Sequence, residues 1–154
     1  MRLLFPLIAC VALSACLTSP KECQDIPSDP AAEQFDPSLG VNIAAMTKTE
    51  IGDYTQDIVA GTGDALVGAD IVTIHYSAYL SNGTLIDQIT DQPFTIDLRT
   101  QSTIGLADGM IGMSVGGQRL IVAPSELALG PCTNGPVPGN STIVYKVELL
   151  SIGS

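Results

Sequence analysis

The sequence predicts an α+β domain in which an antiparallel sheet packs on one short helix. Stretches of alternating apolar and polar residues, typical of half-buried strands, recur between turns rich in Gly and Pro. A single short segment, residues 103–113, carries apolar residues at helical spacing. Strands, then one helix, then further strands together indicate the α+β class.

The composition limits the classes of protein that this chain can belong to. Its 154 residues allow one compact domain with an appendage. With 45% hydrophobic and 14% charged residues, it is not a disordered acidic chain and can bury a core. A net charge of −10 with only six Lys and Arg residues argues against nucleic acid as a partner, because phosphate binding needs basic patches.

The central strand is expected over residues 71–80, where Val72, Ile74, Tyr76, Ala78 and Leu80 share one face. Residues 81–83 follow as Ser-Asn-Gly, which favours a type I′ hairpin turn. The return strand begins at residue 84 and brings Asp87 near Tyr76.

This pair has two interpretations. The tyrosine and the carboxylate can form a site on an apolar sheet. Alternatively, Tyr76 is a core tyrosine with a satisfied hydroxyl, and Asp87 is a strand-edge or capping carboxylate. His75 points to the opposite face and has no Cys or His companion at ligand spacing, so a metal role is not expected.

The remaining elements follow from the same patterns. One or two strands are expected over residues 47–59, with Tyr54, Ile58 and Val59 as inward candidates. A polar loop is expected over 88–92, and the helix at 103–113 would have Ser102 or Thr103 as N-cap. The other expected segments are strands at 93–98, 118–123 and 141–150, and a long Pro/Gly loop at 130–139.

The N-terminus resembles a bacterial lipoprotein signal. A short basic start and an eleven-residue apolar run lead to Leu13-Ser-Ala-Cys16. The resemblance implies a signal peptide over residues 1–15, acylation of Cys16 and a membrane anchor. Leu17 stands where an aspartate would retain the protein at the inner membrane, so an outer-membrane position facing the periplasm is expected. The alternative is an ordinary signal peptide without lipid.

Residues 16–45 are interpreted as a lipidated tether, because Pro residues punctuate a polar segment without apolar periodicity. The folded domain would then span residues 46–154. Cys23 and Cys132 remain as an even pair in an oxidising compartment, which predicts a disulfide between them. Two free thiols are the alternative.

From about Thr47 to Ile152 the chain resembles the FKBP-type peptidyl-prolyl isomerase family. Eight blocks in the family's order carry the resemblance: Gly61-Thr-Gly63, Val72–Tyr76, Leu80–Thr84 with Asp87, Pro93-Phe94, Gly105–Gly109, Met113–Arg119, Pro124–Ala128 with Gly130, and Val144–Leu150. The resemblance implies a twisted antiparallel half-barrel of five or six strands wrapped around one short helix.

The resemblance also implies a pocket between helix and sheet. Tyr76 and Asp87 match its tyrosine and aspartate, and Phe94 and Tyr145 match aromatic wall positions. At three positions where the family has aromatic residues, this chain has aliphatic ones. Where the family has a Val-Ile pair that binds ligands through its backbone, this chain has two hydroxyl-bearing residues. The aliphatic positions are Ile86, Leu106 and Leu129, and the hydroxylic ones are Ser102 and Thr103.

The function implied is cis–trans isomerisation of X-Pro bonds, assisting the folding of exported envelope proteins. Rotation about this bond breaks no covalent bond, so neither cofactor nor metal is expected. The expected partners are proline-containing polypeptides and, through acylated Cys16, a lipid membrane. Two alternatives are a non-catalytic peptide-binding or chaperone module of the same fold and, more weakly supported, a structural envelope component with an acidic docking face.

Overall fold

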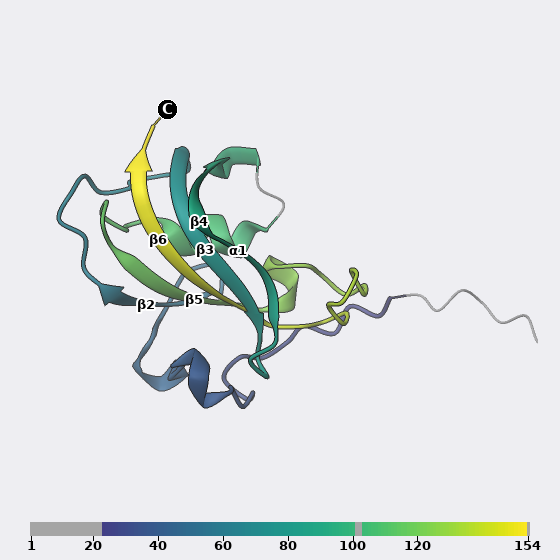
Figure 1. Ribbon diagram of the computed structural model, residues 1–154. Helices are drawn as coiled ribbons and strands as arrows, with labels where there is room; N and C mark the ends of the chain where they lie inside the picture. The colour runs from purple at the N-terminus through teal and green to yellow at the C-terminus, as the bar shows by residue number, and fades with distance from the viewer. Residues whose placement is uncertain (1–22, 101–102, 154) are drawn as a thin grey trace, which may run out of the picture.

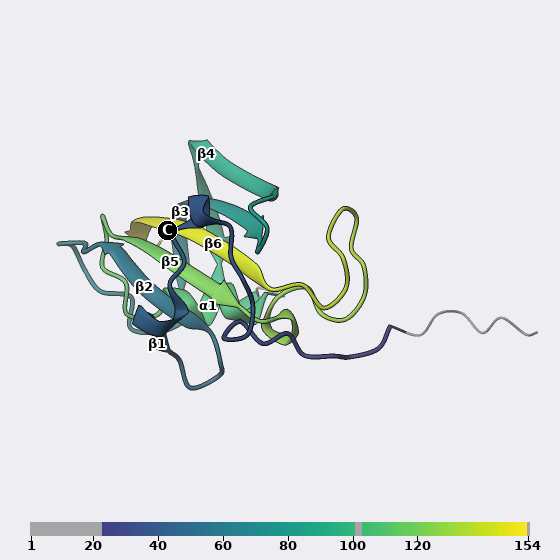
Figure 2. The same cartoon turned by 90° about the horizontal axis from the view of Figure 1, so that it is seen from below.

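The structure is a computed structural model that describes residues 23–100 and 103–153. The proposed signal peptide, Cys16 and Ser102 lie outside these residues. Six strands form one antiparallel sheet in the order β1-β2-β5-β6-β3-β4. They are β1 (Thr47–Lys48), β2 (Tyr54–Val59), β3 (Ile71–Leu80), β4 (Leu85–Asp97), β5 (Gln118–Ala123) and β6 (Ile143–Ile152). The helix α1 (Ile104–Met110) lies against one face of the sheet (Figures 1 and 2). The expected fold class is confirmed.

The alternating side chains of β3 explain how the sheet holds the helix. Val72, Ile74 and Ala78 are buried on the face toward α1, where they join Leu106 and Met110 of the helix in one core. β3 pairs with β4 on one side and β6 on the other. The pattern of period two that predicted this strand is therefore the pattern that builds the core.

Arg119 of β5 fastens the end of the helix to the sheet. Its Nη1 donates to the carbonyl oxygens of Gly109 (3.0 Å) and Ile111 (2.8 Å), and its Nε donates to Asp57 of β2 (2.6 Å). The last carbonyls of a helix have no partner within the helix. The guanidinium supplies one, and so fixes a helix of only seven residues in place.

The structure corrects three local expectations. Of the two central turn residues, only Gly83 has a positive φ (+84°), so the turn is not type I′. Residues 88–92 are strand rather than loop: β4 is continuous, and its polar residues lie on an exposed edge. Ile58 is 59% exposed and Val59 45% exposed, so neither points into the core.

The N-terminal segment also differs from expectation. Residues 35–46 pack on the face of the sheet opposite α1, where Leu39 is only 3% exposed beside Leu120, Val122 and Val144. This part of the expected tether therefore belongs to the folded domain. Its sparse apolar residues are too irregularly spaced to reveal this by periodicity.

A disulfide joins Cys23 to Cys132. Hydrogen bonds continue the attachment: the Ser28 hydroxyl accepts from the backbone N–H of Ser125 (2.7 Å) and from the Thr142 hydroxyl (2.8 Å). The N-terminal segment is thus bound to the chain on both sides of the 130–139 loop. Within the residues described, none of the helices is both long and apolar enough to traverse a lipid bilayer.

Candidate functional site

An irregularity in the pairing of β3 with β4 positions the candidate site. Ile74 pairs with Phe94 but Tyr76 pairs with Ile89, so residues 90–93 of β4 form an insertion between the two pairs. Phe94 consequently lies beside Tyr76, with ring centroids 6.0 Å apart and planes tilted by 48°. Further along the hairpin, Asp87 pairs with Ala78, and the Tyr76 hydroxyl donates a hydrogen bond to the Asp87 carboxylate.

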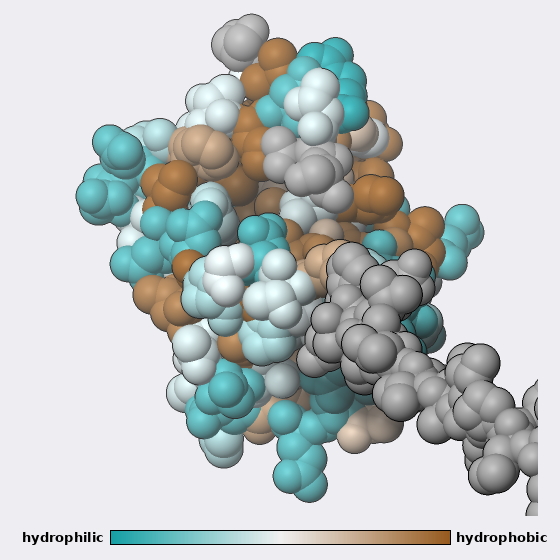
Figure 3. Space-filling view, turned by 90° about the vertical axis from the view of Figure 1, so that its right-hand side faces the viewer, coloured by the Kyte–Doolittle hydropathy of each residue, from teal (hydrophilic) through white to brown (hydrophobic). Residues whose placement is uncertain are grey.

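These side chains line a hollow of about 300 Å³ between the sheet and α1. Its wall is predominantly apolar, with the Tyr76–Asp87 pair on one side. Figure 3, which views the molecule from this side, shows apolar surface gathered around a depression. The lining residues are Tyr76, Ala78, Ile86, Asp87, Phe94, Ile96, Thr103, Leu106, Leu129, Ile143 and Tyr145.

The structure brings together every site residue that the family resemblance implied within the described part of the chain. Eight of them line the one hollow: Tyr76, Asp87, Ile86, Phe94, Thr103, Leu106, Leu129 and Tyr145. Ser102 falls outside the described residues. The prediction omitted Ala78, Ile96 and Ile143. Strand alternation was the available signal, because Ala78 shares a face with Tyr76, and Ile96 with Phe94.

Burial sets the ionisation of the two pocket tyrosines. Burial raises the pKa of Tyr76 to about 12, and the hydrogen bond and negative charge of Asp87 add to this shift. Burial likewise raises the pKa of Tyr145 above its ordinary value, although a side-chain hydrogen bond with Thr103 acts in the opposite direction. Both hydroxyls therefore remain protonated near neutral pH and can serve as hydrogen-bond donors.

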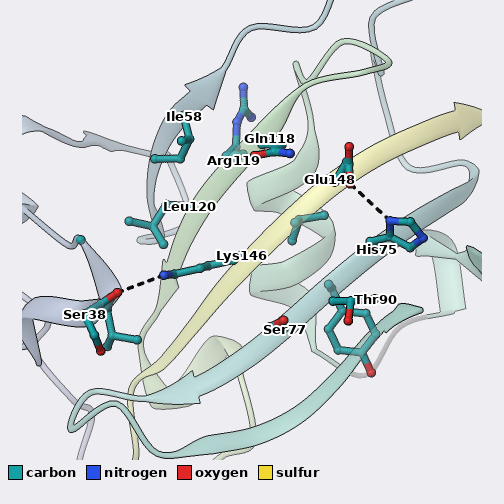
Figure 4. Close-up of a pocket in the computed structure, with 14 residues that line it drawn as sticks. Ser38, Ile58, His75, Ser77, Thr90, Gln118, Arg119, Leu120, Lys146 and Glu148 are labelled. Carbon is teal, nitrogen blue, oxygen red and sulfur yellow. Dashed lines mark hydrogen bonds and ion pairs between the residues drawn. The ribbon is translucent and has the colours of Figure 1, made fainter. Parts of the chain in front are cut away.

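A second hollow, of about 400 Å³, lies on the opposite face of the sheet (Figure 4). Its charged groups already have partners: His75 Nδ1 lies 3.3 Å from Glu148 Oε2, and Lys146 Nζ donates to the Ser38 carbonyl at 3.2 Å. Polar and charged side chains make up more than half of its lining residues, whereas the smaller hollow is lined mostly by aliphatic and aromatic side chains, so the smaller hollow is the better candidate site. In the ranges 23–100 and 103–153, no cluster of three or more His, Cys, Asp or Glu residues could hold a metal ion.

Comparison with known proteins identifies the family. Residues 63–150 match the family described as FKBP-type peptidyl-prolyl cis-trans isomerase. This chain belongs to that family. An FK506-binding protein of Neisseria meningitidis serogroup B is 37% identical over 105 residues, which are 66% of this chain and 96% of that protein. The expected enzyme class, an FKBP-type peptidyl-prolyl cis-trans isomerase, is confirmed.

Other relatives of this FKBP-type isomerase are longer. The isomerase FkpA of Aeromonas hydrophila is 38% identical over 106 residues, 68% of this chain but only 39% of that protein. The crystal structure of Escherichia coli FkpA superposes with a TM-score of 0.64 at 30% identity, covering 70% of this chain and 51% of FkpA. The chain therefore matches only one part of each of these longer proteins.

Proposed function

We propose that the hollow between α1 and the sheet is where this FKBP-type isomerase binds the proline ring of a substrate polypeptide and turns the preceding amide bond. The observation that carries this proposal is the convergence of the rings of Tyr76, Phe94 and Tyr145 on one largely apolar space of about 300 Å³. A hollow filled by other side chains, or these three rings pointing to different places, would have contradicted the proposal.

The chemistry requires only selective stabilisation of a twisted amide. Conjugation gives the X-Pro bond a rotational barrier of about 18–20 kcal/mol, and rotation through the twisted state breaks no covalent bond. A catalyst must favour the twisted form over the planar one. An apolar enclosure does so, because the planar form is the more charge-separated of the two and loses more solvation when water is excluded.

Each lining group has a role under this proposal. Phe94, Leu106 and Ile86 supply apolar surface around the ring, and Tyr145 and Leu129 complete the wall. Tyr76 and Asp87 form a polar rim, in which the carboxylate orients the phenol through the hydrogen bond between them. Fixed dipoles placed beside the rotating amide act more strongly there than in water.

An isomerisation assay tests this function. The full chain carrying Cys16→Ser is mixed with an X-Pro peptide, and the cis-to-trans rate is compared with the uncatalysed rate. We expect acceleration that is lost when Asp87→Ala and Phe94→Ala remove the rim and the wall. No acceleration at high enzyme concentration would reject the catalytic use of the hollow.

The second candidate function is a binding module without catalysis. The aliphatic Leu106 and Leu129 in the lining favour this alternative, because they offer less aromatic surface to a proline ring. This alternative predicts binding of apolar peptides that survives both Asp87→Ala and Tyr76→Phe. It also predicts no change in the isomerisation rate when the protein is added.

We further propose that residues 1–15 are a signal peptide that is removed, and that the chain acts on exported envelope proteins while anchored by acylated Cys16. The Leu-Ser-Ala-Cys sequence at residues 13–16 supports this proposal. The Cys23–Cys132 disulfide is also consistent with an oxidising compartment. Fractionation of cells tests it: Cys16→Ser should move the protein from the membrane to the soluble fraction, and continued membrane association would contradict the anchor.

A further inference from the structure

A long loop forms one side of the hollow between the sheet and α1. Residues 128–142 connect the short 3-10 helix η4 (Ser125–Leu127) to β6, contain neither helix nor strand, and carry Leu129 into the lining. Loops of this length are uncommon in compact domains, and those that occur are often functional. The position of Leu129 therefore depends on the contacts that fasten this loop.

The N-terminal residues 23–33, here called the strap, hold both ends of the loop through Ser28. The Ser125 backbone N–H donates to the Ser28 hydroxyl (2.7 Å), and the Ser28 backbone N–H donates to the Ser125 hydroxyl (3.1 Å). The same Ser28 hydroxyl lies 2.8 Å from the hydroxyl of Thr142. Ser125 is only 1% exposed, so loss of the Ser28 hydroxyl would leave a buried N–H without a partner.

Asn140 adds a second attachment between the loop and the strap. Its Oδ1 accepts from the backbone N–H of Ile26 (3.2 Å), and its Nδ2 donates to the carbonyl oxygen of Gln24 (3.0 Å). Among the residues that the structure describes, Asn140 alone has a positive φ (+59°) without being a glycine. The bonds to the strap give an amide side chain a use at a position that otherwise favours glycine.

The two attachments converge on Gly130, the residue next to Leu129. The Gly130 N–H donates to the Ser125 carbonyl oxygen (2.8 Å), and the Gly130 carbonyl oxygen accepts from the Asn140 N–H (3.0 Å). Ser125 and Asn140 are the two loop partners that the strap holds. The backbone beside Leu129 is thus fixed by the same residues that the strap fastens.

We propose that the strap positions the Leu129 side of the hollow, and that Ser28 and Asn140 are positioning residues for the binding of prolyl peptides. This inference rests on the proposed function of the hollow. The strap lies outside residues 63–150, so it adds to the part of the chain that matches the family. Figure 1 shows the strap, in purple, running alongside the loop, to which the Cys23–Cys132 disulfide also joins it.

The test uses the full chain carrying Cys16→Ser in the X-Pro peptide assay, with kcat and KM measured separately. Ser28→Ala removes the bridging hydroxyl, and Asn140→Gly removes the amide while glycine readily keeps the positive φ. Leu129→Ala removes the side chain that the strap is proposed to position. Thr133→Ala is the matched control, because it shortens an exposed side chain of the same loop. Thermal midpoints are recorded for every variant, and the assays are run well below the lowest of them.

We expect the double variant Ser28→Ala with Asn140→Gly to raise KM roughly fivefold, as expected for losing part of the contact between a leucine side chain and the peptide. Its kcat should stay within about twofold of wild type, because this contact is made equally in the ground state and the transition state. In a Leu129→Ala background the same two substitutions should leave KM unchanged. Thr133→Ala should match wild type. A purely structural role of the strap would lower the thermal midpoint, and its effect on KM would not depend on Leu129.

The outcomes separate this inference from the function beneath it. If wild type accelerates isomerisation and the folded double variant keeps the wild-type KM, the positioning role is wrong while the proposed function stands. An equal rise in KM with and without Leu129 would also overturn it. If the double variant does not fold, the two single variants decide, and a wild-type KM in both overturns the inference. If wild type does not accelerate the reaction, the proposed function and this inference fail together.

Discussion

Gly109 of α1 packs directly against Ile121 of β5, with no space for a side chain between them. A Cβ at position 109 would lie 2.5 Å from Cγ2 of Ile121, well inside van der Waals contact. The glycine lowers the helix propensity of α1, but it lets the helix approach the sheet closely. This approach sets the depth at which Leu106, one turn earlier, faces the hollow.

Gly109→Ala should therefore destabilise the protein by about 1–3 kcal/mol, since overpacking at Ile121 exceeds the gain in helix propensity. Denaturant unfolding measures the change. Gly68→Ala is the matched control, because a Cβ there meets nothing within 4 Å and the backbone φ is not positive. Equal stability of Gly109→Ala and wild type would show that the helix can move away from the sheet.

Arg119→Lys should cost about 2–4 kcal/mol although it preserves the charge. A lysine ammonium cannot hold both carbonyls and the Asp57 carboxylate in the fixed geometry of a guanidinium, and the part-buried Gly109 carbonyl would lose its partner. Arg99→Lys is the control, because its pair with Asp97 is exposed to solvent and contributes little to stability. Similar losses in both variants would contradict the fastening role of Arg119.

Asp53 should make stability fall as the pH rises. Its side chain is fully buried, and within the described structure neither carboxylate oxygen has a hydrogen-bond partner. Burial raises its pKa to about 7, and the negative charges of Asp108 and Glu126 add to the shift. The folded protein therefore keeps a proton that the unfolded chain releases above about pH 4, and unfolding becomes easier between about pH 4 and pH 7.

Unfolding free energies measured from pH 4 to pH 8 check this expectation. Wild type should lose up to about 4 kcal/mol across that window, at about 1.4 kcal/mol per pKa unit, and Asp53→Asn should lack this part of the slope. Asp64→Asn, at an exposed position, is the control. Parallel pH profiles for wild type and Asp53→Asn would mean that the carboxylate finds a partner when it ionises.

Loss of the disulfide should destabilise the domain by about 2–5 kcal/mol, because the bridge closes a loop over 109 positions of sequence. Cys23→Ser with Cys132→Ser removes it without leaving a free thiol. Mass spectrometry after alkylation without reductant should find neither cysteine modified in the wild-type protein. Two alkylated thiols would show that the pair is reduced in the isolated protein.

Leu106→Trp should raise the isomerisation rate if the aliphatic lining limits catalysis. Leu106 lines a hollow of about 300 Å³, which leaves room for a larger ring that would contact the proline. The peptide assay measures the rate, and a tryptophan at Val67, which is 92% exposed, is the control. A folded Leu106→Trp variant with unchanged activity would indicate that the lining is not limiting.

The sequence predicted best where one physical pattern dominates. Residues 71–80 were recognised with their correct bounds, because the strand is half-buried and alternates regularly. For residues 88–92 the sequence predicts a loop, since an edge strand with polar side chains has no apolar face to reveal it. Asp53 gave no signal either, because its burial depends on Gly105 of α1, which is distant in sequence.

The site followed mainly from the family resemblance, and the strand pattern added the pairing of Tyr76 with Asp87. That the Tyr76 hydroxyl donates directly to the Asp87 carboxylate required the folded structure, because the bond depends on side-chain directions across two strands. Arg119 was part of a matching block, but its bonds to the end of α1 required the folded structure.

The disulfide at Cys23 also limits the distance between the folded domain and the proposed lipid anchor at Cys16. With Cys16 acylated, free chain would run only from residue 16 to residue 23, and a fully extended stretch of that length spans about 25 Å. The isomerase would then stay close to the membrane surface. Its clients would be polypeptides that pass within a few nanometres of the bilayer, rather than those diffusing freely through the compartment.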